Sequence, residues 1–208
     1  TRSERYSYSE TFIRDQIAGF SELADVFTIH SGRLPERKED GALLSSRLFW
    51  VMHKIVKTVS GKRNNYFGNQ GVKKYFHDNK IDVVLANYGL SAAHLVPICS
   101  ELNIPLLVIF HGHDATDKKL LRHYADKYNV LFAYASAVVA VSRDMKAGLI
   151  KLGADPEKIV VIPCGVNVAK FKPSSSAKEN LFIAVGRFVA KKGPLFTIQA
   201  FYKLWKKN

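Results

Sequence analysis

The sequence predicts an α/β protein built on a doubly wound parallel sheet. Two observations predict this class. Short runs rich in Val, Ile and Leu alternate with amphipathic segments, and the runs are apolar throughout rather than at every second residue. Continuous apolar runs are typical of strands buried on both faces, as in parallel sheets covered by helices. In such a sheet, ligands bind at the carboxyl ends of the strands.

The apolar runs and the helical periodicity divide the chain into alternating elements. The runs predict six strands, at residues 26–30, 82–86, 106–110, 137–141, 159–162 and 181–185. The periodicity predicts helices over 9–24, 43–59, 69–79, 90–102, 118–134, 143–152 and 195–206. The helix over 43–59 has the clearest pattern, because one stripe holds Leu44, Leu48, Met52, Ile55 and Val59.

Two domains and a linker are expected. Residues 1–165 form the first α/β domain, 166–180 the linker with its Ser174-Ser-Ser176 run, and 181–208 the start of a second domain. One strand and one helix cannot bury a core, so the second domain is expected to be incomplete. The first strand of the first domain is also expected to be missing, or its place to be filled by another segment. Near the start of the chain, Ser7-Tyr-Ser-Glu10 has the spacing of a capping box, so a helix is expected to begin at once, with Ser7 or Ser9 as the cap.

The chain is strongly basic. Its 208 residues hold 31 Lys and Arg against 18 Asp and Glu, a formal charge of +13. Such an excess suits a polyanion, namely nucleic acid, anionic lipid or a phosphorylated ligand. No zinc-finger spacing, RNP box or basic tail supports nucleic acid, which is therefore not expected as a partner. A solvated basic face is the alternative interpretation.

The sequence predicts a cytoplasmic location. No apolar run approaches the roughly 20 residues that span a bilayer. The first residues do not form the basic and then apolar leader of a secreted protein. Cys99 and Cys164 lie far apart in dissimilar contexts, which indicates a reducing compartment without a disulfide framework.

The segment Phe110-His-Gly-His-Asp114 ends the expected strand 106–110, where a parallel sheet binds its ligands. Three interpretations stay open: metal ligands, structural histidines, or a contact from His111 to a ligand. The H-x-H-x-D-H pattern of binuclear zinc hydrolases fails, since Ala115 and Thr116 replace its Asp and His. Zinc needs three or four ligands, and the one later histidine is His123. No metal site is therefore expected.

The segment Gly186-Arg-Phe-Val-Ala-Lys-Lys-Gly193 has the features of a phosphate-binding loop. Gly186 lets the backbone approach a ligand, and the helix that follows offers free N–H groups. Arg187 and Lys192 add cationic donors that suit phosphate. The spacing matches neither G-x-G-x-x-G nor a P-loop, so solvated lysines in a turn are the alternative.

Four segments in this order resemble glycosyltransferase family 4. They are Ser9-Glu-Thr-Phe-Ile13, the Phe110–Asp114 segment, the stretch from Val141 to Asn167 with Phe171 and Pro173, and Val185-Gly-Arg-Phe with Lys192-Gly193. The first looks like the opening helix of exopolysaccharide (colanic-acid-type) members. The resemblance implies two facing Rossmann-like domains, the GT-B fold, of which the second is truncated in this sequence.

The resemblance also implies a function and a site. It implies a retaining enzyme that moves a sugar from a UDP- or GDP-linked donor to a glycan or lipid-linked acceptor in exopolysaccharide biosynthesis. His111 matches a histidine that contacts the donor sugar. Gly186, Arg187 and Lys192 match the loop that binds the donor diphosphate, while Gly112, Asp114 and Ser9 are candidates for acceptor or sugar contacts. Because Arg, Lys and a helix N-terminus can stabilise the departing diphosphate, no metal or cofactor is expected.

The sequence departs from the family in two places. The glycine-containing turn after a first strand and the E-x7-E motif do not occur in residues 1–208, so this chain alone is expected to be inactive or very weak. A non-catalytic remnant that binds a nucleotide or an anionic surface is therefore the alternative function. Eight basic residues between 47 and 80 add an expected contact with an anionic membrane, peripheral on the inner face of the plasma membrane.

Overall fold

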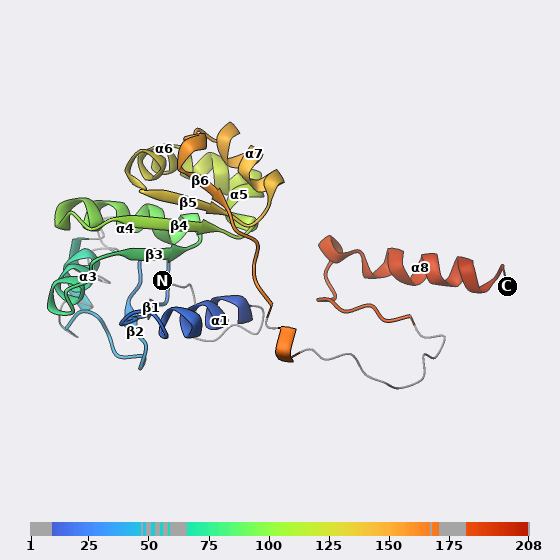
Figure 1. Cartoon of the computed structure of the whole chain (residues 1–208), viewed down its shortest axis with the longest axis horizontal. Coiled ribbons are helices and arrows are strands. Elements are labelled where there is room, and N and C mark those ends of the chain that lie inside the picture. Colours follow the sequence, from blue (N-terminus) through green and yellow to red (C-terminus); the bar gives the residue numbers. More distant parts are fainter. Residues whose placement is uncertain are drawn as a thin grey trace. The chain divides into compact units, whose positions relative to one another are not determined.

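The chain is described here by a computed structural model that divides into two compact units (Figure 1). Unit 1 is Thr1–Val166 and unit 2 is Asn167–Asn208. The structure describes residues 10–46, 66–166, 168–170 and 182–207, together with 48, 51, 52, 55 and 58.

Unit 1 is built on a four-stranded parallel sheet in which each strand pairs with the next one along the chain. The predicted α/β class with a parallel sheet is thereby confirmed. The strand predicted at 106–110 is observed with the same bounds, and the other three differ by one or two residues. The strands are β3 (Val84–Asn87), β4 (Leu106–Phe110), β5 (Ala137–Ala140) and β6 (Ile159–Val161).

A helix follows each of the first three strands of the sheet. They are α4 (Gly89–Leu102), α6 (Lys118–Tyr134) and α7 (Arg143–Lys151), with the one-turn helix α5 (His113–Thr116) before α6. The chain moves across the sheet in one direction, so right-handed crossovers place these helices on one face. In agreement, α4 packs against β3, β4 and α6, while α7 packs against β5 and β6.

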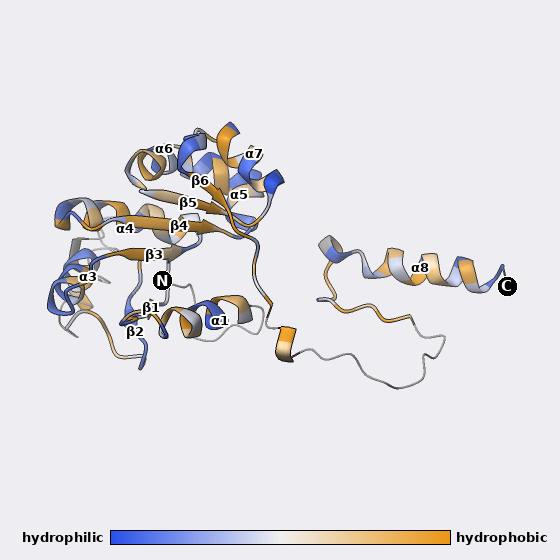
Figure 2. Ribbon diagram, in the orientation of Figure 1, coloured by the Kyte–Doolittle hydropathy of each residue, from blue (hydrophilic) through white to orange (hydrophobic). Residues whose placement is uncertain are grey.

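Aromatic rings fill the core between α6 and the sheet. Phe110, at the end of β4, lies edge-on to Tyr128 at 5.6 Å between ring centroids and 6.0 Å from Phe132. All three side chains are buried, as are Leu106 and Val108 on the same side of the strand. Burying each such side chain stabilises the fold by about 1.5–3 kcal/mol. The strands β3, β4 and β5 are correspondingly among the most hydrophobic segments in Figure 2, and this packing fixes the end of β4 against α6.

The strand predicted at 26–30 is largely wrong. Only β1 (Ile29–His30) forms, and it pairs antiparallel with β2 (Arg37–Lys38) instead of joining the parallel sheet. Ser31 and Gly32 follow at φ values of 72° and 80°. Two successive left-handed residues reverse the chain at once, so the nearest available strand is the one that returns from this turn.

The helices of the first third of the chain differ from their predicted bounds. The helix expected over 9–24 is α1 (Thr11–Phe20), and its proposed caps Ser7 and Ser9 lie outside the described residues. The helix expected over 69–79 is α3 (Tyr66–Asp78). Of the helix expected over 43–59, residues 43–46 are not helical, positions 48, 51, 52, 55 and 58 are, and the others lie outside the description.

Unit 2 contains α8 (Pro194–Trp205) and the single-turn helices η2 (Val168–Lys170) and η3 (Ala190–Lys192). The strand predicted at 181–185 does not form at 182–185, and position 181 is not described. Phe182, Ile183 and Val185 are instead 74–95% exposed. A strand needs a paired neighbour, and the described part of unit 2 provides none. Most of the predicted linker, 171–180, lies outside the described residues.

Candidate functional site

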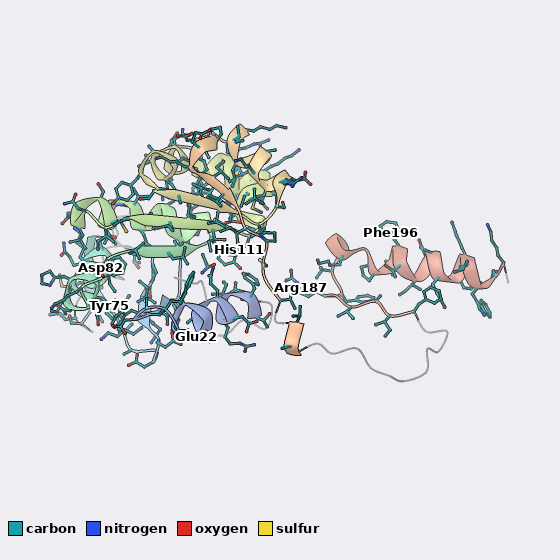
Figure 3. All side chains as sticks on the ribbon, viewed as in Figure 1. Glu22, Tyr75, Asp82, His111, Arg187 and Phe196 are labelled. Carbon is teal, nitrogen blue, oxygen red and sulfur yellow. The ribbon has the colours of Figure 1, made fainter. Side chains whose placement is uncertain are left out.

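The parallel register brings the ends of β3 and β4 side by side. Asn87 pairs with Ile109, and the amide of Tyr88 donates to the Ile109 carbonyl at 2.9 Å. His111 follows directly on β4, so two segments more than 20 residues apart in the sequence meet at the carboxyl edge of the sheet. Figure 3 labels His111 at this edge. This is the position where open parallel sheets bind ligands.

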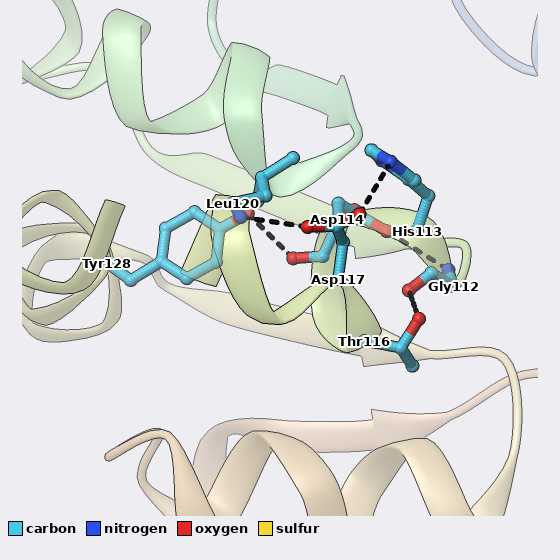
Figure 4. A network of polar contacts seen from close by, with 7 residues as sticks. All are labelled: Gly112, His113, Asp114, Thr116, Asp117, Leu120 and Tyr128. Atoms are coloured by element: carbon cyan, nitrogen blue, oxygen red, sulfur yellow. Dashed lines mark hydrogen bonds and ion pairs between the residues drawn. The ribbon is translucent and has the colours of Figure 1, made fainter. Parts of the chain in front are cut away.

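Asp114 anchors the loop that follows β4 (Figure 4). Its side chain is 1% exposed. Oδ1 accepts hydrogen bonds from the amides of His111 (3.1 Å) and Gly112 (3.0 Å), and Oδ2 accepts one from the Gly89 amide (2.9 Å). Burial raises the pKa of Asp114, although these hydrogen bonds act in the opposite direction. The carboxylate thus ties the loop to the first turn of α4, and its contact with a sugar or acceptor stays a prediction.

The first turn of α4 also requires a glycine. A Cβ atom on Gly89 would lie 2.3 Å from Cε1 of Phe110 and 2.9 Å from the hydroxyl of Tyr128. Both rings are buried, and the Tyr128 hydroxyl donates to the Asp114 carbonyl at 2.8 Å, so neither can move away freely. The aromatic core and the loop after β4 are therefore packed as one body, which holds the backbone of the site rigid.

His111 is enclosed by aromatic rings and held through one ring nitrogen. Its Nε2 lies 2.8 Å from Oδ1 of Asn87. The rings of Phe12 and Tyr88 lie 4.7 Å and 4.8 Å from the imidazole, centroid to centroid. Burial lowers the pKa of His111 to about 4, so the imidazole is neutral at neutral pH. A neutral imidazole can donate a hydrogen bond to a ligand or accept one from it, but it adds no positive charge to the site.

Side chains of helix α1 and of its N-cap residue contact this site. The amide of Asn87 donates from Nδ2 to Oε1 of Gln16 at 3.3 Å, and the Tyr88 hydroxyl donates to Oε1 of Glu10 at 2.8 Å. Tyr88 holds a φ of 76°, a costly value for a residue with a side chain. Burial and then the Glu10 carboxylate raise the pKa of Tyr88, which keeps the phenol protonated.

Sequence reasoning missed Asn87, Tyr88 and Gln16. One signal was present for Asn87. It is the polar residue that directly follows the expected strand 82–86, just as His111 directly follows the expected strand 106–110. Nothing in the local pattern of α1 marks Gln16, because its role depends on a contact with a residue 71 positions away.

The two histidines of the H-x-H-D segment, His111 and His113, have different partners. His113 is exposed, and its Nε2 lies 3.5 Å from Oδ2 of Asp117 one turn later in the chain. Asp114 is occupied by main-chain amides. Within the described residues, no group of three His, Cys, Asp or Glu side chains is placed to hold a metal ion. The two interpretations that concern His111, a structural role and a ligand contact, both fit the geometry.

The candidate phosphate loop lies in unit 2 and leads directly into α8. Arg187 and Lys192 are exposed, and Figure 3 labels Arg187. Gly193 caps the helix at a φ of 62°, and Pro194 is its first residue. Gly186 has open space where a Cβ would lie, so packing does not explain the glycine. The loop thus precedes a helix N-terminus, and its binding of a diphosphate stays a prediction. Ser9, a candidate for acceptor or sugar contacts, lies outside the described residues.

Comparison with known proteins gives a consistent result. The family model of Glycosyltransferase Family 4 matches residues 9–170. The chain is 26% identical to the putative colanic acid biosynthesis glycosyltransferase WcaL of Escherichia coli K12, over 92% of this chain and 57% of that protein. The figures are the same for the amylovoran biosynthesis glycosyltransferase AmsK of Erwinia amylovora. The chain thus spans little more than half the length of these relatives.

Among solved structures, the chain is similar to Anabaena Alr3699/HepE in complex with UDP-glucose. The identity is 20% and the TM-score 0.46, over 52% of this chain and 29% of that one. The family match is far more extensive, since it runs from the start of α1 to η2 and includes the whole sheet and the site around His111. The chain belongs to Glycosyltransferase Family 4, as its ordered motifs and its α/β fold class indicated.

Proposed function

We propose that this chain is part of a retaining glycosyltransferase that moves a sugar from a UDP- or GDP-linked donor to a glycan or lipid-linked acceptor in exopolysaccharide biosynthesis. The family match over residues 9–170 carries the proposal. The position of His111 at the carboxyl edge of the sheet supports it, because this is where a parallel sheet binds ligands. The relatives WcaL and AmsK are glycosyltransferases of colanic acid and amylovoran biosynthesis, which supports an exopolysaccharide as the product.

In this proposal each candidate residue has its own chemical task. The bond between the anomeric carbon and the diphosphate oxygen breaks, and the acceptor hydroxyl oxygen bonds to the anomeric carbon and releases its proton. The neutral His111 of unit 1 holds the donor sugar by a hydrogen bond. Arg187, Lys192 and the N-terminus of α8 in unit 2 neutralise the charge that develops on the diphosphate, without a metal ion. Attack on the face from which the diphosphate departs gives retention.

The function is tested by offering UDP- and GDP-linked sugars, with polysaccharide and lipid-linked acceptors, to the full-length protein that contains this chain. We expect one donor to support transfer, with an α- or β-product of the same anomeric configuration as the donor by NMR. His111→Ala is expected to lower kcat about 10- to 100-fold with a smaller change in donor affinity, because its contact is strongest in the transition state. The exposed His113 serves as the control, and His113→Ala is expected to leave kcat unchanged.

Two results would contradict this proposal. Nucleotide binding without turnover for every donor would favour the non-catalytic remnant. Neither binding nor turnover would remove both functions.

We also propose that the described helical positions 48, 51, 52 and 55 contact an anionic membrane. Leu48, Val51, Met52 and Ile55 are 68%, 45%, 40% and 56% exposed. Their i, i+3, i+4 and i+7 spacing places them on one helical face. None of the helices in the described part of the chain is long and apolar enough to cross a bilayer. The basic residues between 47 and 80 would add about 1 kcal/mol each wherever they reach an anionic surface.

Vesicle sedimentation tests the membrane contact. We expect the protein to sediment with vesicles rich in phosphatidylglycerol but not with phosphatidylcholine alone, and the double variant Met52→Glu/Ile55→Glu to lose most of this binding. Val130 on α6 is 58% exposed and provides a matched control. If Val130→Glu weakens binding as much as the double variant does, net charge explains the effect and the helical face does not.

A further inference from the structure

The imidazole of His111 is constrained on one nitrogen and unsatisfied on the other. Nε2 lies 2.8 Å from an Asn87 side-chain oxygen that is part of a buried amide, 3% exposed as a residue. Nδ1 is buried and has no hydrogen-bond partner within the described residues. A buried polar atom without a partner has lost its hydrogen bonds to water without replacing them, so its retention calls for an explanation.

We propose that Asn87 is a positioning residue that holds His111 in the Nε2–H tautomer and so leaves Nδ1 as a hydrogen-bond acceptor for a ligand hydroxyl. The assignment of the tautomer does not depend on the proposed function, whereas the binding of a sugar hydroxyl to Nδ1 rests on the proposed function.

The orientation of the Asn87 side-chain amide indicates which nitrogen of His111 carries the proton. Asn87 donates from Nδ2 to Oε1 of Gln16, which turns its Oδ1 toward His111. An amide oxygen only accepts hydrogen bonds, so the atom that faces it at 2.8 Å has to donate. The other tautomer would place two lone pairs against each other at this distance. A neutral imidazole has one N–H group, and with that group on Nε2 the lone pair is on Nδ1.

Burial keeps the imidazole in this single-proton state. The pKa of His111 is lowered to about 4, so both nitrogens are protonated together only in acid. The neighbouring titratable groups are Glu10 and Tyr88, the N-cap residues of α1 and α4, which hydrogen-bond to each other. Asp114 lies on the loop of His111, and its oxygens accept hydrogen bonds from main-chain amides. Because Nδ1 is buried, neighbouring side chains have to shift for a ligand to reach it, and the half-buried Phe12 lies against the same imidazole ring.

The proposal identifies the chemistry of the ligand atom. An acceptor nitrogen recognises a donor, so His111 would bind a hydroxyl that donates rather than a carbonyl or a phosphate oxygen that only accepts. Donation to Nδ1 would also satisfy the buried atom, so that part of the cost of the unliganded site is recovered on binding.

Nitrogen NMR reads the tautomer directly. In long-range ¹H–¹⁵N spectra of the ¹⁵N-labelled chain at pH 7, we expect the His111 ring to show a protonated Nε2 and an unprotonated Nδ1, assigned by the signals that His111→Gln removes. Asn87→Ala is expected to give a mixture of both tautomers. Asn87→Asp keeps an acceptor oxygen and adds a charge, so it is expected to retain the tautomer and raise the pKa of His111 by about one unit or more.

Asn79, which directly follows α3, provides the matched control, since its Nδ2 donates to the Tyr75 carbonyl. Asn79→Ala and Asn79→Asp are expected to leave the His111 signals and pKa unchanged. An Nδ1–H tautomer in the unmodified protein would overturn the proposal, as would an unchanged tautomer in Asn87→Ala together with an unchanged pKa in Asn87→Asp. Should transfer fail for every donor while the tautomer is as expected, the proposed function is wrong and the role of Asn87 stands.

Discussion

Asp114→Ala is expected to lower the free energy of unfolding of unit 1 by about 3 kcal/mol or more, as measured by urea unfolding with circular dichroism. The physical reason is that the substitution leaves the amides of Gly89, His111 and Gly112 without their acceptor in a buried place. Each unsatisfied buried donor costs about 1–3 kcal/mol. Relief of the buried charge and entry of water offset part of this loss.

A second aspartate in the same segment provides the control. Asp117 is partly exposed and caps α6 by accepting one hydrogen bond from the Leu120 amide at 2.9 Å. Asp117→Ala is expected to cost only about 1 kcal/mol, the usual value of a helix N-cap. Equal losses in the two variants would show that Asp114 is no more than an ordinary cap.

The pH dependence of the Asp114 effect has a definite sign. Burial raises the pKa of Asp114 in the folded chain above its value in the unfolded chain. The folded state therefore binds the proton more tightly, and Asp114 contributes more favourably as the pH falls through its folded pKa. Asp114→Asn lacks this contribution. We therefore expect the free energy of unfolding of the unmodified chain to rise relative to that of Asp114→Asn as the pH falls toward 4. Groups that titrate alike in both proteins do not affect this difference.

The double variant Arg187→Ala/Lys192→Ala is expected to weaken UDP binding on the order of 100-fold or more in titration calorimetry. Each residue would give a charge-assisted hydrogen bond to the diphosphate, worth about 1.5–3 kcal/mol, and 1.4 kcal/mol corresponds to a tenfold change in affinity. Arg187→Lys is expected to lose less than Arg187→Ala, because lysine retains the charge but not the planar pair of donors.

The far end of α8 offers a control with the same change in charge. Lys203 lies in the last turn of the helix and Lys207 just beyond it. Lys203→Ala/Lys207→Ala is expected to leave UDP affinity within about twofold, since an exposed charge farther away than a Debye length of about 8–10 Å is screened. Unchanged affinity in the Arg187/Lys192 variant would remove the diphosphate assignment.

The accuracy of the sequence-based predictions depended on where the stabilising contacts come from. The helix at 118–134 and the strand at 106–110 were predicted with their observed bounds, because their apolar residues pack against neighbouring elements of the same α/β unit. The strand at 26–30 was mostly wrong, because a turn at Ser31 and Gly32 decided its pairing. Apolar content alone does not choose between a parallel and an antiparallel partner.

The candidate site shows the same division. His111 was identified because it follows a buried strand, and Asp114 because it belongs to the same motif. The structure adds that Asp114 is buried among main-chain amides, a role that its residue type does not reveal. Asn87 acquires its role only through the register that places β3 beside β4.

By itself, the sequence determined the α/β class, the positions of the four sheet strands along the chain and the motifs of the family. Each of these depends on residues that are near one another along the chain. Only the tertiary structure decided that the side chains of Gln16, Asn87 and His111 meet. It also decided that the carboxylate of Asp114 is buried. Hydrogen bonds act over about 3 Å, so they depend on the packing that brings distant segments together, whereas periodicity depends only on the local chain.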